Sequence, residues 1–179
     1  MRRWAWRGVI WASLIALLTA LGFAYYRYHL PYGWSHCCDL ALGFALERYA
    51  DEHDGWFPRG EATPEASLSL LYQYEPLLVV ILGGKAIPPA VAEKTLESGG
   101  LLTPETCDWH YVEGLRSDDD PNLALFWDKS GLGHFGQRLS DGGHVVFFIG
   151  FKREYISRDR WDQFLAEQEQ LRAKLRRPR

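Results

Sequence analysis

The most continuous hydrophobic segment of the chain lies near its start. Residues 8–26, GVIWASLIALLTALGFAYY, contain no charged side chain. As an α-helix with a rise of about 1.5 Å per residue, this segment is roughly 28 Å long, close to the hydrocarbon thickness of a bilayer. Trp4 and Trp6 precede it and tyrosines close it, which is typical of the aromatic belts at membrane interfaces. The pattern predicts a single transmembrane helix over residues 8–26.

The charges beside this segment predict its orientation. Arg2, Arg3 and Arg7 precede it, and Arg27 alone follows directly. Because basic residues favour the cytoplasmic side, we expect residues 1–7 in the cytoplasm and the rest outside it. The alternative is a cleaved signal peptide, with a cut after Ala24 that releases the domain. In both interpretations, the remainder of the chain lies outside the cytoplasm.

Helical spacing of apolar residues dominates the next part of the chain. Pro31 and Gly33 end any helix that leaves the membrane, so residues 27–35 are a predicted linker. Ser35 is a candidate cap for a helix over 36–53, and Thr63 for a helix that begins at Pro64. A further short helix is expected over 88–97. The apolar run 77–84 fits a helix or a strand equally well.

The second half of the sequence changes to strand-forming composition. WHYVEGL (109–115) and NLALFW (122–127) are rich in aromatic and aliphatic residues, and the turn DGG at 141–143 precedes a predicted strand over 145–151. A last helix is expected after a cap at Asp159, with an apolar stripe formed by Trp161, Phe164, Leu165, Leu171 and Leu175. The predicted fold class is therefore α+β: a transmembrane helix, a helical segment, a small antiparallel sheet and a closing C-terminal helix. The exported domain is expected to cover residues 36–179.

The charge distribution argues against nucleic acid as a partner. The net charge of -3 conceals an acidic middle, with 18 acidic and 7 basic residues between Asp39 and Asp141. From Lys152 to Arg179 there are 9 basic and 5 acidic residues. Two basic ends around an acidic middle do not form the single basic face that binding to duplex nucleic acid requires.

Three cysteines fit an exported domain. Cys37 and Cys38 are adjacent, and Cys107 lies far downstream. Neighbouring cysteines rarely pair with each other, because the geometry across one peptide bond is strained. A disulfide from Cys107 to Cys38, or else to Cys37, is therefore expected. The alternative is three free thiols, and a zinc site is disfavoured because the usual paired spacings are missing.

Four segments in order resemble one bacterial family. They are CCDLALGFALERYADEHDGWFP, LLTPETCDWHYVEGL, NLALFWDKSGLGHFGQRLSDGGHVVFFIG and ISRDRWDQFLAEQ, which together cover most of residues 37–166. The series is similar to pseudopilin-like proteins that carry the prepilin-type processing-associated H-x(9)-D-G domain, with His134, Asp141, Gly142 and His144 at the motif positions. The resemblance implies a pilin-like fold and a non-catalytic role in a type II secretion pseudopilus, a type IV filament or a related envelope assembly.

The sequence departs from that family at several positions. His134 lies seven residues before Asp141, and Gly143 is inserted before His144. The prepilin processing signal needs a glutamate at the fifth position after the cleaved glycine, and Ser13 occupies that position after Gly8. We therefore expect a pilin-like domain whose N-terminal segment lacks the complete signal for prepilin cleavage.

Candidate chemistry is sparse. Asp128, His134, Asp141 and His144 lie close along the chain, and two imidazoles with two carboxylates are able to bind a divalent metal with an open position. This alternative describes an exported metal-binding module or a metal-dependent hydrolase. Asp141 also suits a turn cap, and His144 suits packing beside a strand. The sequence contains no phosphate-binding loop, no Gly-x-Ser-x-Gly elbow and no His-Glu-x-x-His motif. We expect no enzyme, no cofactor and no small-molecule substrate.

The C-terminal helix is the best candidate for an interaction surface. Its apolar stripe either closes the core or meets a partner, and its basic end suits anionic lipid or the acidic middle of a second copy. The residues expected at such a contact with a partner or lipid are Trp161, Phe164, Arg172, Lys174, Arg176 and Arg177. The expected protein is a single-pass membrane protein that associates with itself or with envelope proteins.

Overall fold

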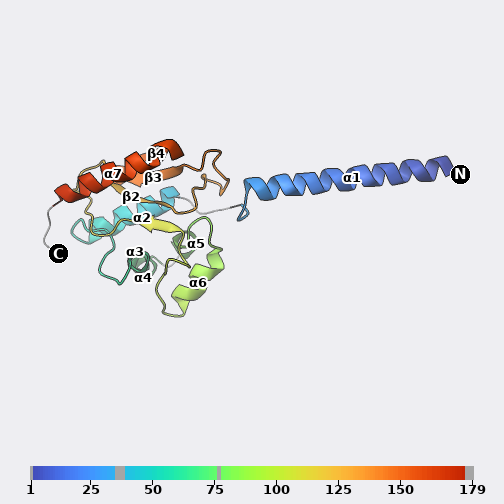
Figure 1. The fold of residues 1–179 in the computed structure, drawn as a ribbon. Coiled ribbons are helices and arrows are strands. Elements are labelled where there is room, and N and C mark those ends of the chain that lie inside the picture. The colour runs from blue at the N-terminus through green and yellow to red at the C-terminus, as the bar shows by residue number, and fades with distance from the viewer. Residues whose placement is uncertain (1, 35–38, 76–77, 176–179) are drawn as a thin grey trace.

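A computed structural model describes residues 2–34, 39–75 and 78–175 of the chain. It contains a long N-terminal helix that projects from an α+β domain (Figure 1). This helix, α1, runs from Arg2 to His29 and extends beyond the predicted span at both ends. Residues 27–29 of the predicted linker are therefore helical, and the helix ends just before Pro31: Leu30 still donates to the Tyr26 carbonyl, and Gly33 has a positive φ of 84°.

Within the described residues, five short helices follow before the sheet begins. Helix α2 spans Asp39–Glu52, and its buried face includes Leu42 and Leu46. Helices α3 (Pro64–Leu68), α4 (Leu70–Tyr74), α5 (Val79–Leu82) and α6 (Pro89–Glu97) complete this half of the domain. The ambiguous apolar run thus contains a helix, and the predicted cap at Thr63 is confirmed, because its hydroxyl accepts from Ala66 N–H at 3.1 Å. The predicted cap Ser35 lies outside the described residues.

The sheet is a four-stranded antiparallel meander. Its strands are β1 (Trp109–Tyr111), β2 (Ala124–Asp128), β3 (His144–Phe148) and β4 (Arg153–Ile156), in the order β1-β2-β3-β4. The predicted strand over 145–151 ends early, because a 3-10 turn with Gly150 at φ 75° covers Ile149–Phe151. β4 was not expected from the sequence.

Every residue of β2 is buried because helices cover both faces of the sheet. On one face Phe126 stacks on Phe147 at 4.9 Å, beneath α2. A Cβ added to Gly43 of α2 would lie 2.6 Å from a carbon of the Phe147 ring. Only a glycine therefore lets α2 approach the Phe147 ring this closely.

The other face of the sheet packs against α7, which spans Arg158–Lys174. Phe164 is 5% exposed and meets both Trp127 and Phe148 through ring edges. The predicted apolar stripe of α7 thus closes the core. The N-cap is Ser157 instead of Asp159, and the two side chains are hydrogen-bonded to each other.

Candidate functional site at the end of α1

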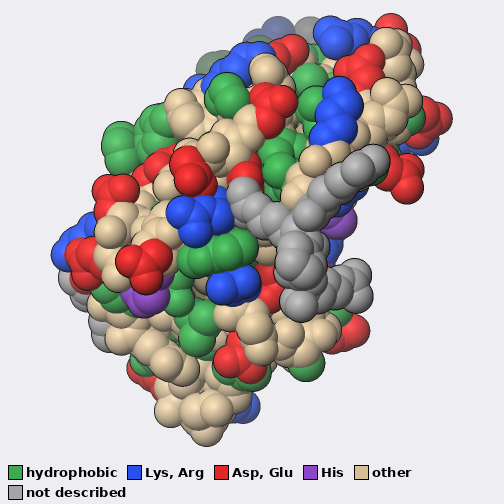
Figure 2. All heavy atoms as spheres, turned by 90° about the vertical axis from the view of Figure 1, so that its left-hand side faces the viewer, with side chains coloured by type: hydrophobic (Ala, Val, Ile, Leu, Met, Phe, Trp, Pro, Cys, Tyr) green, Lys and Arg blue, Asp and Glu red, His purple; other side chains and the backbone are tan. Residues whose placement is uncertain are grey.

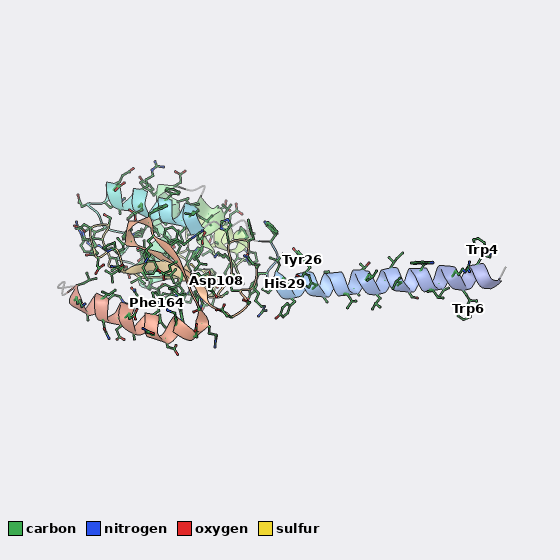
Figure 3. All side chains as sticks on the ribbon, turned by 90° about the horizontal axis from the view of Figure 1, so that it is seen from above. Trp4, Trp6, Tyr26, His29, Asp108 and Phe164 are labelled. Atoms are coloured by element: carbon green, nitrogen blue, oxygen red, sulfur yellow. The ribbon has the colours of Figure 1, made fainter. Side chains whose placement is uncertain are left out.

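Helix α1 is the one helix among the described residues that is long and apolar enough to cross a membrane. Its segment Trp6–His29 has a mean hydropathy of 1.9, and none of it is buried within the protein. Trp4 and Trp6 lie at its far end, and Tyr26 and His29 lie where it meets the domain (Figure 3). A helix that exposes apolar side chains on all sides needs an apolar environment outside the chain.

A loop of the domain contacts the end of α1. In this β2–β3 loop (residues 129–143), the backbone N–H of Arg138 donates to the His29 carbonyl at 2.7 Å. The Arg138 guanidinium donates to the Tyr28 carbonyl at 3.4 Å and lies over the Tyr28 ring, 5.5 Å from its centroid. The last carbonyls of a helix have no partner within it and carry partial negative charge. Arg138 therefore provides a donor and a positive charge at the point where α1 leaves the domain.

The loop is in turn held by a buried ionic network. Lys85, between α5 and α6, places its Nζ 3.2 Å from Asp128 Oδ2 and 3.1 Å from the Leu132 carbonyl. The side chains of Lys85 and Asp128 are both 0% exposed. Asp128 also accepts from the Leu132 N–H at 2.7 Å. One ion pair thus fixes both backbone groups of Leu132, the residue at the base of the loop.

Asp39 extends this network to α2 and β4. One of its carboxylate oxygens lies 3.9 Å from Lys85 Nζ, and the other meets His134 Nδ1 at 3.3 Å and Arg153 Nη1 at 3.4 Å. Asp39 is the first residue of α2, where a carboxylate is stabilised by the helix dipole. The network therefore joins α2, the α5–α6 connection, β2, β4 and the loop that holds α1.

Removing one partner from a buried ion pair leaves an uncompensated charge, at a cost of about 3–5 kcal/mol. The pair of Lys85 and Asp128 is for this reason a strong determinant of where Leu132 and the rest of the loop lie. The arrangement positions a backbone segment. Through this segment, the ion pair also helps to hold the end of α1 against the domain.

A further buried carboxylate lies close to this network. Asp108 is 6% exposed, and its Oδ1 accepts from the Ser130 hydroxyl at 2.6 Å. Its Oδ2 has no hydrogen-bond partner among the described residues. Burial raises the pKa of the Asp108 carboxyl, although the Ser130 hydroxyl opposes this shift. Asp128 raises it further by charge repulsion.

The predicted motif residues Asp141, Gly142 and His144 stabilise the β2–β3 loop through hydrogen bonds, turn geometry and packing. Asp141 accepts from the Gly143 N–H at 3.2 Å and from the Tyr155 hydroxyl, and these hydrogen bonds lower its carboxyl pKa. Gly142 has a φ of 68°, as the turn requires. His144 bonds to the Asp128 carbonyl at 2.9 Å and packs on Trp161, with ring centroids 4.1 Å apart. The turn cap and the packed histidine were both among the expected alternatives.

The structure does not bring the candidate metal ligands together. Asp128 binds Lys85, His134 binds Asp39, and Asp141 binds Tyr155. Within residues 2–34, 39–75 and 78–175, no group of three or more His, Cys, Asp or Glu side chains is placed to hold a metal ion. The geometry thus gives no support to the metal-binding alternative.

The predicted disulfide also receives no support. Cys107 is a free thiol with 0% exposure, 3.3 Å from the Leu82 carbonyl, while Cys37 and Cys38 lie outside the described residues. Burial raises the pKa of the Cys107 thiol to about 12, so the reactive thiolate is rare at neutral pH.

The six predicted contact residues lie in different surroundings. Phe164 is buried in the core, where it packs on the sheet and offers little surface to a partner or to lipid. Trp161 and Arg172 line an open groove of about 710 Å³ between α7 and the sheet, together with His110, Trp127, Lys129 and His144. Lys174 is exposed near the end of α7, and Arg176 and Arg177 lie beyond the described residues. On the end of the domain that faces away from α1, acidic and basic side chains are interspersed (Figure 2).

The residues that hold α1 were not predicted from the sequence. Lys85 follows an apolar run and two glycines and looks like an ordinary surface lysine, and Arg138 lies in a polar loop. A lysine between apolar segments is a weak signal of a buried pair, because its carboxylate partner is distant in the sequence. Arg138 carries no such signal.

Comparison with known proteins gives no match: no protein-family model, curated protein or solved structure matches this chain. Its function is therefore inferred from the residues and geometry described above.

Proposed function

We propose that this chain is a non-catalytic, membrane-anchored, pilin-like protein that serves as a structural or interaction component of a bacterial envelope, secretion or filament assembly. The observation that carries the proposal is the junction of Arg138 with the end of α1, because it makes an apolar helix and a packed domain into one mechanical unit. A signal sequence that is removed after export has no need of such a contact.

The order of elements supports the pilin-like part of the proposal. An exposed apolar helix is followed by α2, and α2 packs on an antiparallel meander through Gly43 and Phe147. This is the order that the resemblance to pseudopilin-like proteins implies. The break between α1 and α2, at Leu30 to Gly33, differs from a continuous pilin helix and limits how closely neighbouring copies pack along it.

The charge asymmetry around α1 supports the proposed topology. Arg2, Arg3 and Arg7 precede the apolar segment, and Arg27 lies near its other end. We infer a cytoplasmic N-terminus and an extracytoplasmic domain. The proposed location is the cell membrane, with a single pass.

The use of titratable groups supports a non-catalytic role. Lys85, Asp128 and Asp39 neutralise one another inside the domain, and Asp141 and His144 hold turns and packed rings. Each of these groups has a role in fixing the β2–β3 loop. Buried ionic groups of this kind are structural in many proteins.

The exposed basic end of α7 is the proposed contact with an acidic partner surface, for which the acidic middle of a second copy is suitable. To test this, the full chain is extracted from membranes in a mild detergent and its assemblies are weighed by native mass spectrometry. Assemblies heavier than the single chain of 20.6 kDa are expected. The double substitution Arg172→Glu and Lys174→Glu should reduce them, whereas Arg160→Glu at the start of the same helix should not.

A protein that is monomeric under every mild extraction condition, with no other envelope protein bound, would contradict the proposed role in an assembly. Equal losses from the double variant and from Arg160→Glu would contradict the proposed contact, because the effect would then follow net charge alone.

A further inference from the structure

Exposed aromatic side chains gather where α1 meets the domain. Tyr28 is 63% exposed, Tyr32 58%, Trp34 56% and Phe135 48%. The first is on the last turn of α1, the next two follow that helix, and Phe135 comes from the β2–β3 loop. We call these four residues the aromatic collar. An exposed cluster of large aromatic rings is unusual on a soluble domain and marks a contact surface.

The loop presents Phe135 at the tip of a small hairpin. Leu132 and Arg138 form an antiparallel bridge, and Gly133 accepts from the Gly136 N–H at 3.0 Å across the turn between them. The Phe135 ring contacts the Trp34 ring, with centroids 5.0 Å apart. The ionic network holds Leu132 at the base of this hairpin, and Arg138 ties its other side to α1. Phe135 is thus placed beside the end of α1 by contacts at both sides of the hairpin.

The position of the aromatic collar along α1 matches a membrane interface. From Trp4 to Tyr28 the helix is about 36 Å long at 1.5 Å per residue, against about 30 Å for the hydrocarbon core of a bilayer. When Trp4 and Trp6 lie in one headgroup region, Tyr28 lies in the other, at the depth that Trp and Tyr prefer. Arg27 and Arg138 lie at the same level, where their charges suit lipid phosphates.

We propose that the aromatic collar inserts into the lipid interface of the membrane that α1 spans, so that the domain rests on the bilayer through Phe135 and Trp34. This inference rests on the proposed anchor and adds a second, independent lipid contact made by the folded domain. The occupant is the lipid interface because the aromatic collar is continuous with the apolar surface of α1. With both contacts made, the domain has a fixed height and tilt above the membrane.

The eight tryptophans of the chain allow a direct test. The full-length protein is labelled with 5-fluorotryptophan and reconstituted into nanodiscs that each hold one copy, and the fluorine resonances are assigned by single Trp→Phe substitutions. Lipid that carries a nitroxide near the top of its acyl chains is then added. Trp34 should broaden to within about twofold of Trp6 and Trp11 of α1, which report the anchor. Trp56 should stay sharp, because it follows α2, a helix about 20 Å long that begins at the junction.

The outcomes separate this inference from the proposed anchor. Broad Trp6 and Trp11 resonances with a sharp Trp34 resonance would overturn the lipid contact of the aromatic collar and leave the anchor intact. The same result is expected if the aromatic collar binds a second copy, because each nanodisc excludes one. Sharp resonances for Trp6 and Trp11 would overturn both the anchor and the inference that rests on it.

A substitution at the hairpin tip tests the part that Phe135 plays. Phe135→Asp should reduce the broadening of Trp34 at least twofold, because a carboxylate at this depth is repelled by the interface. Phe44→Asp is the matched control: Phe44 is a 63% exposed ring on α2, and its substitution should leave Trp34 unchanged. An unchanged resonance of Trp109, which is 1% exposed, verifies that each variant is folded. Equal broadening of Trp34 in the wild type and in Phe135→Asp would overturn the role of the tip.

Discussion

Arg138 donates its backbone N–H to the carbonyl oxygen of His29 over 2.7 Å, and this contact joins a loop of the sheet to the last residue of α1. It places the positive charge of Arg138 at the negative end of the helix dipole, where such a charge contributes about 0.3–1 kcal/mol. The hydrogen bond therefore attaches the C-terminal end of α1 to the β2–β3 loop of the domain.

Removal of the Arg138 side chain should loosen this junction. Arg138→Ala keeps the backbone donor but removes the cation at Tyr28, so the amides of Leu30 and Gly33 should exchange with deuterium about fivefold faster, which corresponds to about 1 kcal/mol. Hydrogen exchange read by mass spectrometry on the protein in nanodiscs measures this. Arg160→Ala, at an exposed position on α7, is the control. Unchanged exchange in Arg138→Ala would show that the side chain does not stabilise the end of α1.

The buried ion pair should dominate the stability of the domain. Lys85→Met leaves the carboxylate of Asp128 buried without its cation and is expected to cost about 3–5 kcal/mol. The double variant Lys85→Met and Asp128→Asn should recover part of this loss, because a neutral amide oxygen still accepts from Leu132. Denaturant unfolding of the full chain in detergent, followed by tryptophan fluorescence, gives the values. Lys94→Met, on the exposed side of α6, should lower the free energy of unfolding only slightly. An equally small decrease for Lys85→Met would contradict the stabilising role of the buried pair.

Asp108 predicts a specific dependence of stability on pH. Because burial raises its pKa in the folded state, the folded protein binds the proton more tightly than the unfolded chain does. The stabilising contribution is present below the ordinary Asp pKa and is lost as the pH rises through the raised value. Asp108→Asn should therefore stabilise the domain by about 1 kcal/mol at pH 8 and by less at pH 4.5. Unfolding at both pH values tests this, with exposed Glu97→Gln as the control, and a benefit that is independent of pH would contradict it.

The contact of α2 with the sheet depends on Gly43, which has no side chain. Gly43→Ala would place a Cβ 2.6 Å from the Phe147 ring. Overpacking of this kind costs about 1–3 kcal/mol. Phe147→Leu should restore part of the loss when it is combined with Gly43→Ala, as a double-mutant cycle measures. Gly22→Ala is the matched control, since α1 has nothing within 4 Å of the added Cβ.

Cys107 should resist modification in the folded protein. Its thiol is fully buried and has a pKa of about 12, so alkylation by iodoacetamide at pH 8 should label it only after denaturation. Peptide mass mapping without a reductant measures the label. A denatured, unreduced sample in which Cys107 stays unlabelled and is linked to Cys37 or Cys38 would instead establish the disulfide that the sequence suggests.

Local patterns along the chain predicted much of the fold. Thr63 caps α3 as expected because its hydroxyl acts on a neighbouring backbone group, and the stripe of α7 packs as its spacing requires. Strand β4 escaped prediction because its residues, Arg153–Ile156, are mostly polar at the surface, and the kink at Gly150 that separates it from β3 shows no clear pattern. Gln168 interrupts the α7 stripe for a tertiary reason, since it bonds the backbone of Asn122 and Ala124.

The candidate site was much less predictable than the fold. The motif residues Asp141 and His144 were recognisable because they act on neighbouring turns and strands. Lys85 and Arg138 act on partners that are distant in the sequence, so their roles exist only after folding. A long-range ion pair leaves no periodic signal, whereas an amphipathic helix does.

The most direct test of the account is the intact mass of the protein recovered from alkaline-washed membranes. A membrane-bound chain that still contains residues 1–24 is expected if α1 is the proposed uncleaved anchor. A mature chain that begins at Val9 would establish prepilin processing and filament assembly despite Ser13, and would keep the anchor. A chain that begins at Tyr25, or that is recovered only from the soluble fraction, would contradict the central claim that α1 holds this domain at the membrane.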